Sequence, residues 1–386
     1  MNKIIKRILI GVGVFVGVVV LGAGGYVGYI VLSYNRIGDC DLTVDNKTTL
    51  NEVQVGETYK ALTYNVGFGA YSQDYTFFMD TGYDDDGNET CGKWATARSK
   101  EEVEFNTNGA VNAVFAESPD FVCFQEVDTD STRSYHVNQD KKIMEKFNTY
   151  DHVHAVNFHT AFLPYPFHDM IGVVNAGLTT ISKYKVQSAR RHEYTVSSSL
   201  AKLFDLDRCF SASIINVNNG RKLYLCNSHM SAYDEGGTVR EEQVKELNAF
   251  LKERKDAGDY VVIGGDWNHD LLTNNPDFSY NKTTNRAFGM TKKAPDWVSY
   301  FFSDTGKPLV MDGYSVVASD NYPTCRNNDI QYIPDETFVC GIDGFIVSSN
   351  VEVISHANIQ TKNGNKGLNG FAFADHDPAM MEFRLS

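Results

Sequence analysis

The chain has 386 residues, of which 42% are hydrophobic and 12% aromatic, a composition that suits a packed globule and excludes a disordered chain. Its formal net charge is −14 at pH 7; because the first 36 residues include four basic and no acidic ones, the remainder carries −18. Such an acidic body argues against broad, nonspecific nucleic-acid binding, which relies on many Lys and Arg contacts to phosphate. A local basic cleft, or a divalent metal that bridges to phosphate, is still compatible with this charge.

The seven cysteines contain no CxxC pair, so zinc-ribbon and redox motifs are weak interpretations. Outside the cell one or two disulfides could form, and the odd count would leave at least one thiol unpaired within the chain.

The N-terminal segment is apolar. No charged residue lies between Arg7 and Arg36, and a bilayer-spanning helix needs about 20 apolar residues. Basic residues precede this run, and Asp39 and Asp41 follow it, so the positive-inside rule places the N-terminus in the cytoplasm. We therefore predict that residues 1–36 form a cytoplasmic stub and a single-pass transmembrane anchor, with the remaining chain extracellular.

The alternative for this segment is a cleaved signal peptide, but the run is long for one and lacks a clear small-x-small cleavage site. The pairs Gly13/Gly17 and Gly24/Gly28 have the GxxxG spacing of helix dimers, which is a weak hint of dimerisation. The oligomeric state is otherwise open.

Residues 37–57 are expected to form a polar linker, and residues 58–386 a single catalytic domain. The first strand of this domain is expected at 58–65, where Asn65 closes it. The stretch 70–110 is polar, and its acidic residues mimic part of a calcium loop; the glycine stands at position four and no Glu at position twelve, so we expect a solvated loop. A helix is predicted over 100–115.

Three features follow in the middle of the chain. A buried strand over 121–128 delivers Glu126 to its C-terminal end, where an acid needs a cation or a donor. The loop after it contains Tyr135 beside Arg and His, which are possible phosphate donors. Residues 158–170 are unusually aromatic for a proline-broken loop, and they are interpreted either as a lid or membrane-facing lip or as a packed Ω-loop.

The second half repeats the pattern of an apolar strand that ends in polar residues. His229 closes the strand 222–230, and an amphipathic helix is predicted over 238–255. The strand 259–263 is followed by Gly264-Gly265-Asp266-Trp267-Asn268, in which the two glycines are expected to let the backbone turn tightly. Two further sites precede strands near the C-terminus, namely Asp343 and the pair Asp375-His376.

Eight polar residues thus fall at strand ends, a distribution that packing alone does not explain: Asn65, Glu126, His229, Asp266, Asn268, Asp343, Asp375 and His376. Their types suit metal-assisted hydrolysis of a phosphate ester. Oxygen ligands favour Mg²⁺, with Mn²⁺ or Ca²⁺ as alternatives, and no His/Cys cluster demands zinc.

The ordered motifs Thr-Tyr-Asn, Gln-Glu-Val-Asp, Asn-Ser-His, Gly-Asp-Trp-Asn, Ile-Asp-Gly and Asp-His-Asp-Pro resemble those of the endonuclease/exonuclease/phosphatase superfamily. That group includes pancreatic-type deoxyribonucleases, abasic-site endonucleases, neutral sphingomyelinases and inositol-polyphosphate phosphatases. The resemblance spans about residues 58–386. It implies an α/β fold, a four-layered sandwich of two packed, mainly antiparallel sheets with the site at one edge.

The resemblance also implies a role for each residue. Glu126 would be the main metal ligand, supported by Asn65, and Asp375 would contact the metal region. Asp266 would orient the attacking water and Asn268 would hold a phosphate oxygen. His229 and His376 would stabilise or protonate groups around phosphorus, with Asp343 fixing the imidazole of His376. Arg208 would match a phosphate-binding arginine. Tyr135, from the loop after strand 121–128, is a second candidate for substrate binding.

The sequence leaves the substrate open. The first hypothesis is an outward-facing, membrane-tethered phosphodiesterase that acts on nucleic acid or on a lipid headgroup. The anchor and the aromatic 158–170 segment lean toward lipid, whereas the family leans toward nuclease. The alternatives are a phosphomonoesterase on a small or inositol phosphate, and a catalytically silent binding module with the same fold.

Overall fold

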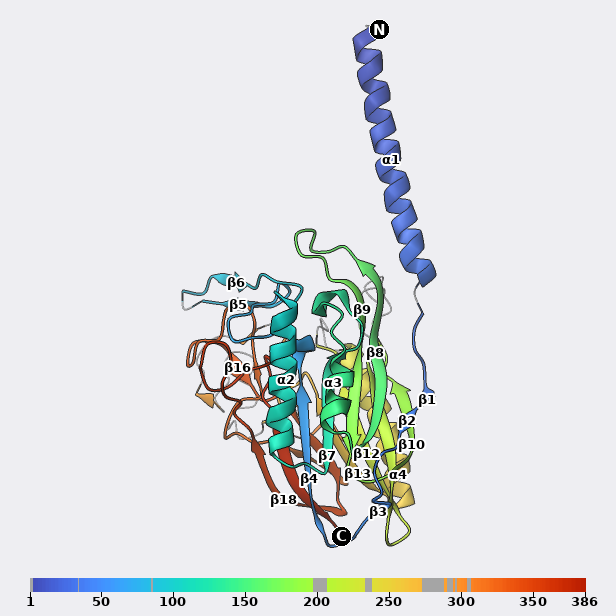
Figure 1. Ribbon diagram of the computed structural model, residues 1–386, viewed down its shortest axis with the longest axis vertical. Coiled ribbons are helices and arrows are strands. Elements are labelled where there is room, and N and C mark those ends of the chain that lie inside the picture. The colour runs from blue at the N-terminus through green and yellow to red at the C-terminus, as the bar shows by residue number, and fades with distance from the viewer. Residues whose placement is uncertain are drawn as a thin grey trace.

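The computed structural model describes residues 3–33, 35–84, 86–196, 207–232, 238–272, 288–289, 294–295, 297–303 and 307–386. Two mixed β-sheets pack face to face, and helices cover their outer faces (Figure 1). This arrangement confirms the predicted α/β sandwich.

The first sheet has the strand order β1 (Cys40–Leu42), β10 (Val186–Glu193), β11 (Cys209–Val217), β12 (Lys222–His229), β13 (Tyr260–Asp266), β17 (Asp343–Ser348) and β14 (Tyr314–Val317), with β3 (Glu52–Val53) beside β11. The second sheet has the order β18 (Val351–Asn358), β19 (Ala379–Leu385), β4 (Thr58–Asn65), β7 (Phe121–Asp128), β9 (Gly172–Ser182), β8 (Asp151–Leu163) and β2 (Val44–Asp45). Two small ribbons pair β5 (Thr81–Tyr83) with β6 (Glu89–Cys91), and β15 (Cys325–Arg326) with β16 (Val339–Cys340).

Most strand pairs are antiparallel, and the two parallel pairs at the sheet centres set the position of the site. Strands β4 and β7 are parallel, as are β12 and β13. Parallel neighbours need a crossover, and α2 (Lys100–Ala116) and α4 (Thr238–Ala257) provide it. Both helices occur where the sequence predicts them. The side chain of Ser99 caps α2 by accepting a hydrogen bond from the N–H of Glu102.

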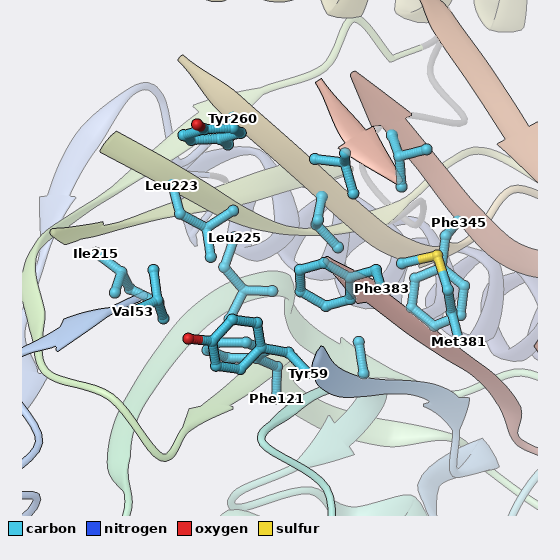
Figure 2. Packing of buried hydrophobic residues seen from close by; sticks show 14 of the residues in the cluster. Val53, Tyr59, Phe121, Ile215, Leu223, Leu225, Tyr260, Phe345, Met381 and Phe383 are labelled. Carbon is cyan, nitrogen blue, oxygen red and sulfur yellow. The ribbon is translucent and has the colours of Figure 1, made fainter. Parts of the chain in front are cut away.

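The core consists of three layers of apolar contacts. Between the sheets, side chains from both inner faces interdigitate, among them Tyr59, Phe121, Leu225 and Phe383 (Figure 2). On the outer faces, α2 and α3 (Gln139–Lys146) cover the second sheet and α4 covers the first. Each fully buried Leu or Phe contributes about 1.5–3 kcal/mol, so this core holds the sheet edges of the site rigidly.

Two segments differ from expectation. Residues 37–57, expected to be a linker, run along the body instead, because β1, β2 and β3 pair with β10, β8 and β11. Strand β8 continues to Leu163, so the first part of the aromatic 158–170 segment is strand, and only residues 164–171 form the loop to β9.

The N-terminal helix α1 (Lys3–Ser33) projects from the body (Figure 1). It is long and apolar enough to cross a membrane, a test that a signal sequence also meets.

Candidate active site

The predicted polar residues meet at one edge of the two packed sheets. Because β4 and β7 are parallel, and β12 and β13 are parallel, the C-terminal ends of each pair lie together. His229 pairs in register with Asp266, and Asp266 pairs with Asp343 at the start of the antiparallel strand β17. Strand topology therefore gathers these three residues, although His229 and Asp343 lie 114 positions apart in the chain.

A cavity of about 200 Å³ opens above this edge. It is lined by seven of the residues expected at the site, which are Glu126, Arg208, His229, Asp266, Asn268, Asp375 and His376. Asn65 and Asp343 lie directly behind the lining, bonded to residues that form it.

Asp266 is held at the centre by two hydrogen bonds. The Asn65 Nδ2 donates to its Oδ2 at 2.8 Å, and the backbone N–H of Asn268 donates to its Oδ1 at 2.9 Å. The same Asn65 Nδ2 lies 3.3 Å from Oε1 of Glu126. In this structure Asn65 therefore joins two carboxylates through its amide nitrogen, while its Oδ1 accepts a hydrogen bond from the N–H of Gly67.

The prediction of a tight turn at Gly264-Gly265 is wrong. Both glycines lie within β13, and neither has a positive φ. They are required for close packing instead: a Cβ on Gly265 would lie 2.6 Å from the carbonyl oxygen of Ser228, and one on Gly264 would lie 3.2 Å from Sγ of Cys123. The left-handed backbone belongs to the functional residues Glu126 (φ 53°) and Asn268 (φ 49°). Such a conformation is strained for Glu, and strain of this kind concentrates at active sites.

The two histidines have opposite environments. The Nδ1 of His376 lies 2.8 Å from Oδ2 of Asp343, and its Nε2 lies 3.8 Å from Oδ2 of Asp266. Burial lowers the pKa of His376, but Asp343 and the other nearby acidic groups outweigh burial and hold this pKa well above the ordinary value. These charges favour the protonated imidazole.

His229 lies with its Nε2 3.5 Å from Oδ2 of Asp266, and its buried Nδ1 has no hydrogen-bond partner within the described chain. Burial holds the pKa of His229 well below the ordinary value, and the positive charges of Arg208 and His376 lower it further. This environment favours the neutral imidazole. A charged and a neutral histidine at one cavity can divide the tasks of proton donor and hydrogen-bond donor.

The carboxylate of Asp375, which also lines the cavity, has little compensating positive charge around it. The Asp375 Oδ2 accepts a hydrogen bond from Asn328 Nδ2 at 2.8 Å, and the same Nδ2 donates to Asp80 at 3.0 Å. Burial raises the pKa of Asp375 to about 6, and the charge of Glu126 adds to the rise against the opposing effects of His376 and Arg326.

A divalent cation fits this region, since buried oxygen donors that repel one another are stabilised by one. The oxygen donors include Oδ1 of Asn328, which is buried and without a hydrogen-bond partner among the described residues. A second arrangement that could hold a metal ion is the buried group Asp266, Asp343 and His376, whose ligand atoms lie within 4.8 Å of one another.

The two substrate-binding candidates are placed differently. Arg208 lines the cavity and is only 4% exposed, and neither its Nε nor its Nη1 has a hydrogen-bond partner in the described part of the chain. Tyr135 is not among the lining residues; its ring is exposed, and its hydroxyl donates to the carbonyl of Arg98 at 3.1 Å. Its neighbour Arg133 lines the cavity, paired with Asp128 at 2.8 Å.

Sequence reasoning missed several lining residues: Tyr71, Asp80, Arg326 and Asn328. The run Asn327-Asn328-Asp329 carries a signal, because consecutive carboxamides and a carboxylate next to a short strand are a typical source of ligands. Tyr71 gives no such signal. It comes within reach only because Gly67 (φ 51°) lacks a side chain: a Cβ there would lie 2.5 Å from the Tyr71 ring and 2.9 Å from Asp375.

The fold has known counterparts. The structure of D. rerio TDP2 complexed with a single-strand DNA product matches at a TM-score of 0.52 and 13% identity, covering 85% of this chain and 99% of that one. The structure of ANGEL2, a 2',3'-cyclic phosphatase, matches at a TM-score of 0.51 and 14% identity, covering 90% and 98%. A search of curated proteins found no match.

The family evidence comes from the sequence itself. A model of the Endonuclease/Exonuclease/phosphatase family matches residues 62–311, which include Glu126, His229 and Asp266 of the cavity. With well over half of its length matched and the fold in agreement, the chain belongs to the Endonuclease/Exonuclease/phosphatase family and is a phosphoric ester hydrolase.

Proposed function

We propose that this protein is a divalent-metal-dependent phosphodiester hydrolase whose catalytic body is tethered outside the membrane by α1. The observation that carries the proposal is that one cavity brings carboxylates together with free hydrogen-bond donors. Glu126, Asp266 and Asp375 line it, and so do Arg208 and His229; Nε and Nη1 of Arg208 and Nδ1 of His229 have no hydrogen-bond partner among the described residues. A phosphate bridged to a cation by the carboxylates and hydrogen-bonded by Arg208 and His229 fits this lining.

Glu126 and Asp375 would hold the cation, with Asn328 and Asn65 fixing the two carboxylates. We propose Mg²⁺, with Mn²⁺ or Ca²⁺ as alternatives, because the donors are oxygen atoms. When bound, the cation would neutralise charge that develops on the phosphate oxygens.

The chain's own residues would direct the attack. Asp266, fixed by Asn65 and Asn268, orients a water molecule and accepts its proton as the oxygen bonds to phosphorus. The amide of Asn268 uses one N–H on the carbonyl of Met230, at 2.8 Å, and retains the second for a phosphate oxygen. His229 and Arg208 donate to the same phosphate.

The leaving group needs a proton. His376, charged and fixed by Asp343, supplies it to the alkoxide as the old P–O bond breaks, which leaves a phosphomonoester and an alcohol. The apolar wall formed by Phe158, Leu163 and Ile171 offers a surface for one organic arm of the diester.

The test is hydrolysis by the purified full chain with Mg²⁺ against DNA, sphingomyelin and phosphoinositide. We expect Glu126→Ala, His229→Ala and His376→Ala each to lower turnover by at least about 10²-fold with the fold intact. His136→Ala is the matched control, because His136 is exposed and lies outside the cavity lining. Near-normal turnover in two of the three site variants would refute the assignment, and cleavage of small monoesters alone would favour the phosphomonoesterase.

A further inference from the structure

We propose that the tip of the β8–β9 hairpin, residues 162–170, enters the surface of the same bilayer that α1 crosses. This inference depends on the membrane anchor of the proposed function but on no catalytic step. The occupant of this surface is therefore the lipid interface itself.

The first support is the contact between the hairpin and α1. The hydroxyl of Tyr26 donates to the carbonyl of Phe162 at 2.9 Å, and the N–H of Phe162 donates to the hydroxyl of Tyr29 at 3.4 Å. Figure 1 shows the hairpin projecting beyond the body, beside the last turns of α1 and toward its N-terminal end. The tip and the helix thus lie side by side.

The second support is the depth at which they meet. The basic residues before Ile8 belong outside the hydrocarbon core, which is about 30 Å thick. At about 1.5 Å per residue, about 20 residues cross it, so a core that begins at Ile8 ends near Val27. Tyr26 and Tyr29 then lie at the outer boundary, where aromatic residues with hydroxyl groups concentrate. Phe162 is bonded to both, so the tip beyond Phe162 lies at the level of the headgroups or deeper.

The third support is what the tip exposes. Phe167 is 77% exposed and Tyr165 is 62% exposed, and Phe162 and Met170 are also exposed. Aromatic side chains this accessible are unusual on a surface that faces only water. Met79, beside the tip in the 70–80 loop, is exposed as well, and Phe78 packs against Tyr165 with ring centroids 5.8 Å apart.

The fourth support is the orientation of the one acidic group in the tip. The carboxylate of Asp169 is turned inward, where it accepts hydrogen bonds from the N–H of Ala95 at 2.7 Å, and from the N–H and hydroxyl of Thr96 at 3.1 and 2.6 Å. The tip contains no Lys, Arg or Glu, and His168 is its only other ionisable group apart from Tyr165. Its outward face can therefore enter an interface without burying an acidic group.

The residues at the base of the tip belong to the catalytic cavity. Leu163 and Ile171, which flank residues 164–170, line the catalytic cavity, and so does Met79. Insertion of the tip would hold the apolar side of the cavity mouth against the bilayer surface, within reach of phosphodiesters presented there.

The experiment is depth-dependent fluorescence quenching of the full chain in vesicles of phosphatidylcholine, with or without bromine on the acyl chains. Three single variants each add one tryptophan at an exposed position: Phe167→Trp in the tip, Phe15→Trp within α1 and Ile354→Trp on β18 as the matched control. The wild-type emission, from three native tryptophans, is subtracted.

We expect the added emission of Phe167→Trp to be lost in brominated vesicles, as for Phe15→Trp, while that of Ile354→Trp is unchanged. Quenching of Phe15→Trp without quenching of Phe167→Trp would overturn the hairpin proposal and leave the anchor intact. Quenching of Phe167→Trp alone would remove the anchor and overturn the proposal that the tip enters the bilayer that α1 crosses. Quenching of neither would overturn both.

Discussion

Replacement of Arg208 by methionine should make the protein more stable and less active at once. Burying a donor without a partner costs about 1–3 kcal/mol, and the guanidinium of Arg208 has two such N–H groups, on Nε and Nη1. Methionine has a similar length and no polar hydrogen, so Arg208→Met should raise the free energy of unfolding by about 1–3 kcal/mol.

The activity should change in the opposite direction. A hydrogen bond to a charged group is worth about 1.5–3 kcal/mol, so two donors to the phosphate together contribute about 3–6 kcal/mol. At about 1.4 kcal/mol per factor of ten, kcat/KM should fall roughly 10²- to 10⁴-fold.

The assay pairs calorimetric unfolding in detergent micelles with hydrolysis kinetics, both on the full chain. Arg190→Met is the matched control, because Arg190 is half-exposed on β10 and pairs with Asp41 at 3.0 Å; its loss should change neither quantity strongly. A strongly destabilised Arg208→Met with unchanged kcat/KM would refute the reasoning, since Arg208 would then be a structural residue.

Three further predictions follow from the site and its supports. Glu126→Gln should abolish the rise in melting temperature that Mg²⁺ produces in the wild type, because ligand binding stabilises only a folded site; an equal rise in both would contradict the ligand role. Asp343→Asn should lower kcat by at least about 10²-fold with KM little changed, since the imidazole of His376 loses its charged partner; unchanged kcat in stopped-flow or steady-state assays would remove Asp343 from the mechanism. Asp140→Asn should lower stability at neutral pH by about 1–3 kcal/mol. Burial raises the pKa of Asp140, but hydrogen bonds from His152 and His154 outweigh it and hold this pKa far below the ordinary value. The difference in unfolding free energy between wild type and Asp140→Asn should therefore be full above about pH 4 and should diminish as pH falls toward the folded-state pKa of Asp140. A difference that grows in acid would disprove this prediction.

The sequence predicted the elements whose signal is local. Helices α2 and α4 have apolar residues at helical spacing, so both were found close to their observed ends. Residues at strand ends, such as Glu126 and His229, were found because an apolar run that stops at a polar residue marks the edge of a sheet.

What escaped depends on contacts between distant segments. The need for Gly264 and Gly265 comes from Cys123 and Ser228 on neighbouring strands, which no local pattern reveals. The contact of Asn328 with Asp375 joins segments 47 residues apart, and Tyr71 reaches the site because Gly67 has no Cβ. The short strands within 37–57 are edge strands with few apolar residues, and their pairing is set by the sheets they join.

The most direct test of the central claim is cleavage of a chromogenic phosphodiester by the full chain, with Mg²⁺ and with a chelator, beside His376→Ala. The account predicts turnover that disappears with the chelator, returns when Mg²⁺ is restored, and falls at least about 10²-fold in His376→Ala. Turnover that persists in the chelator, or that is the same in His376→Ala as in the wild type, would contradict it.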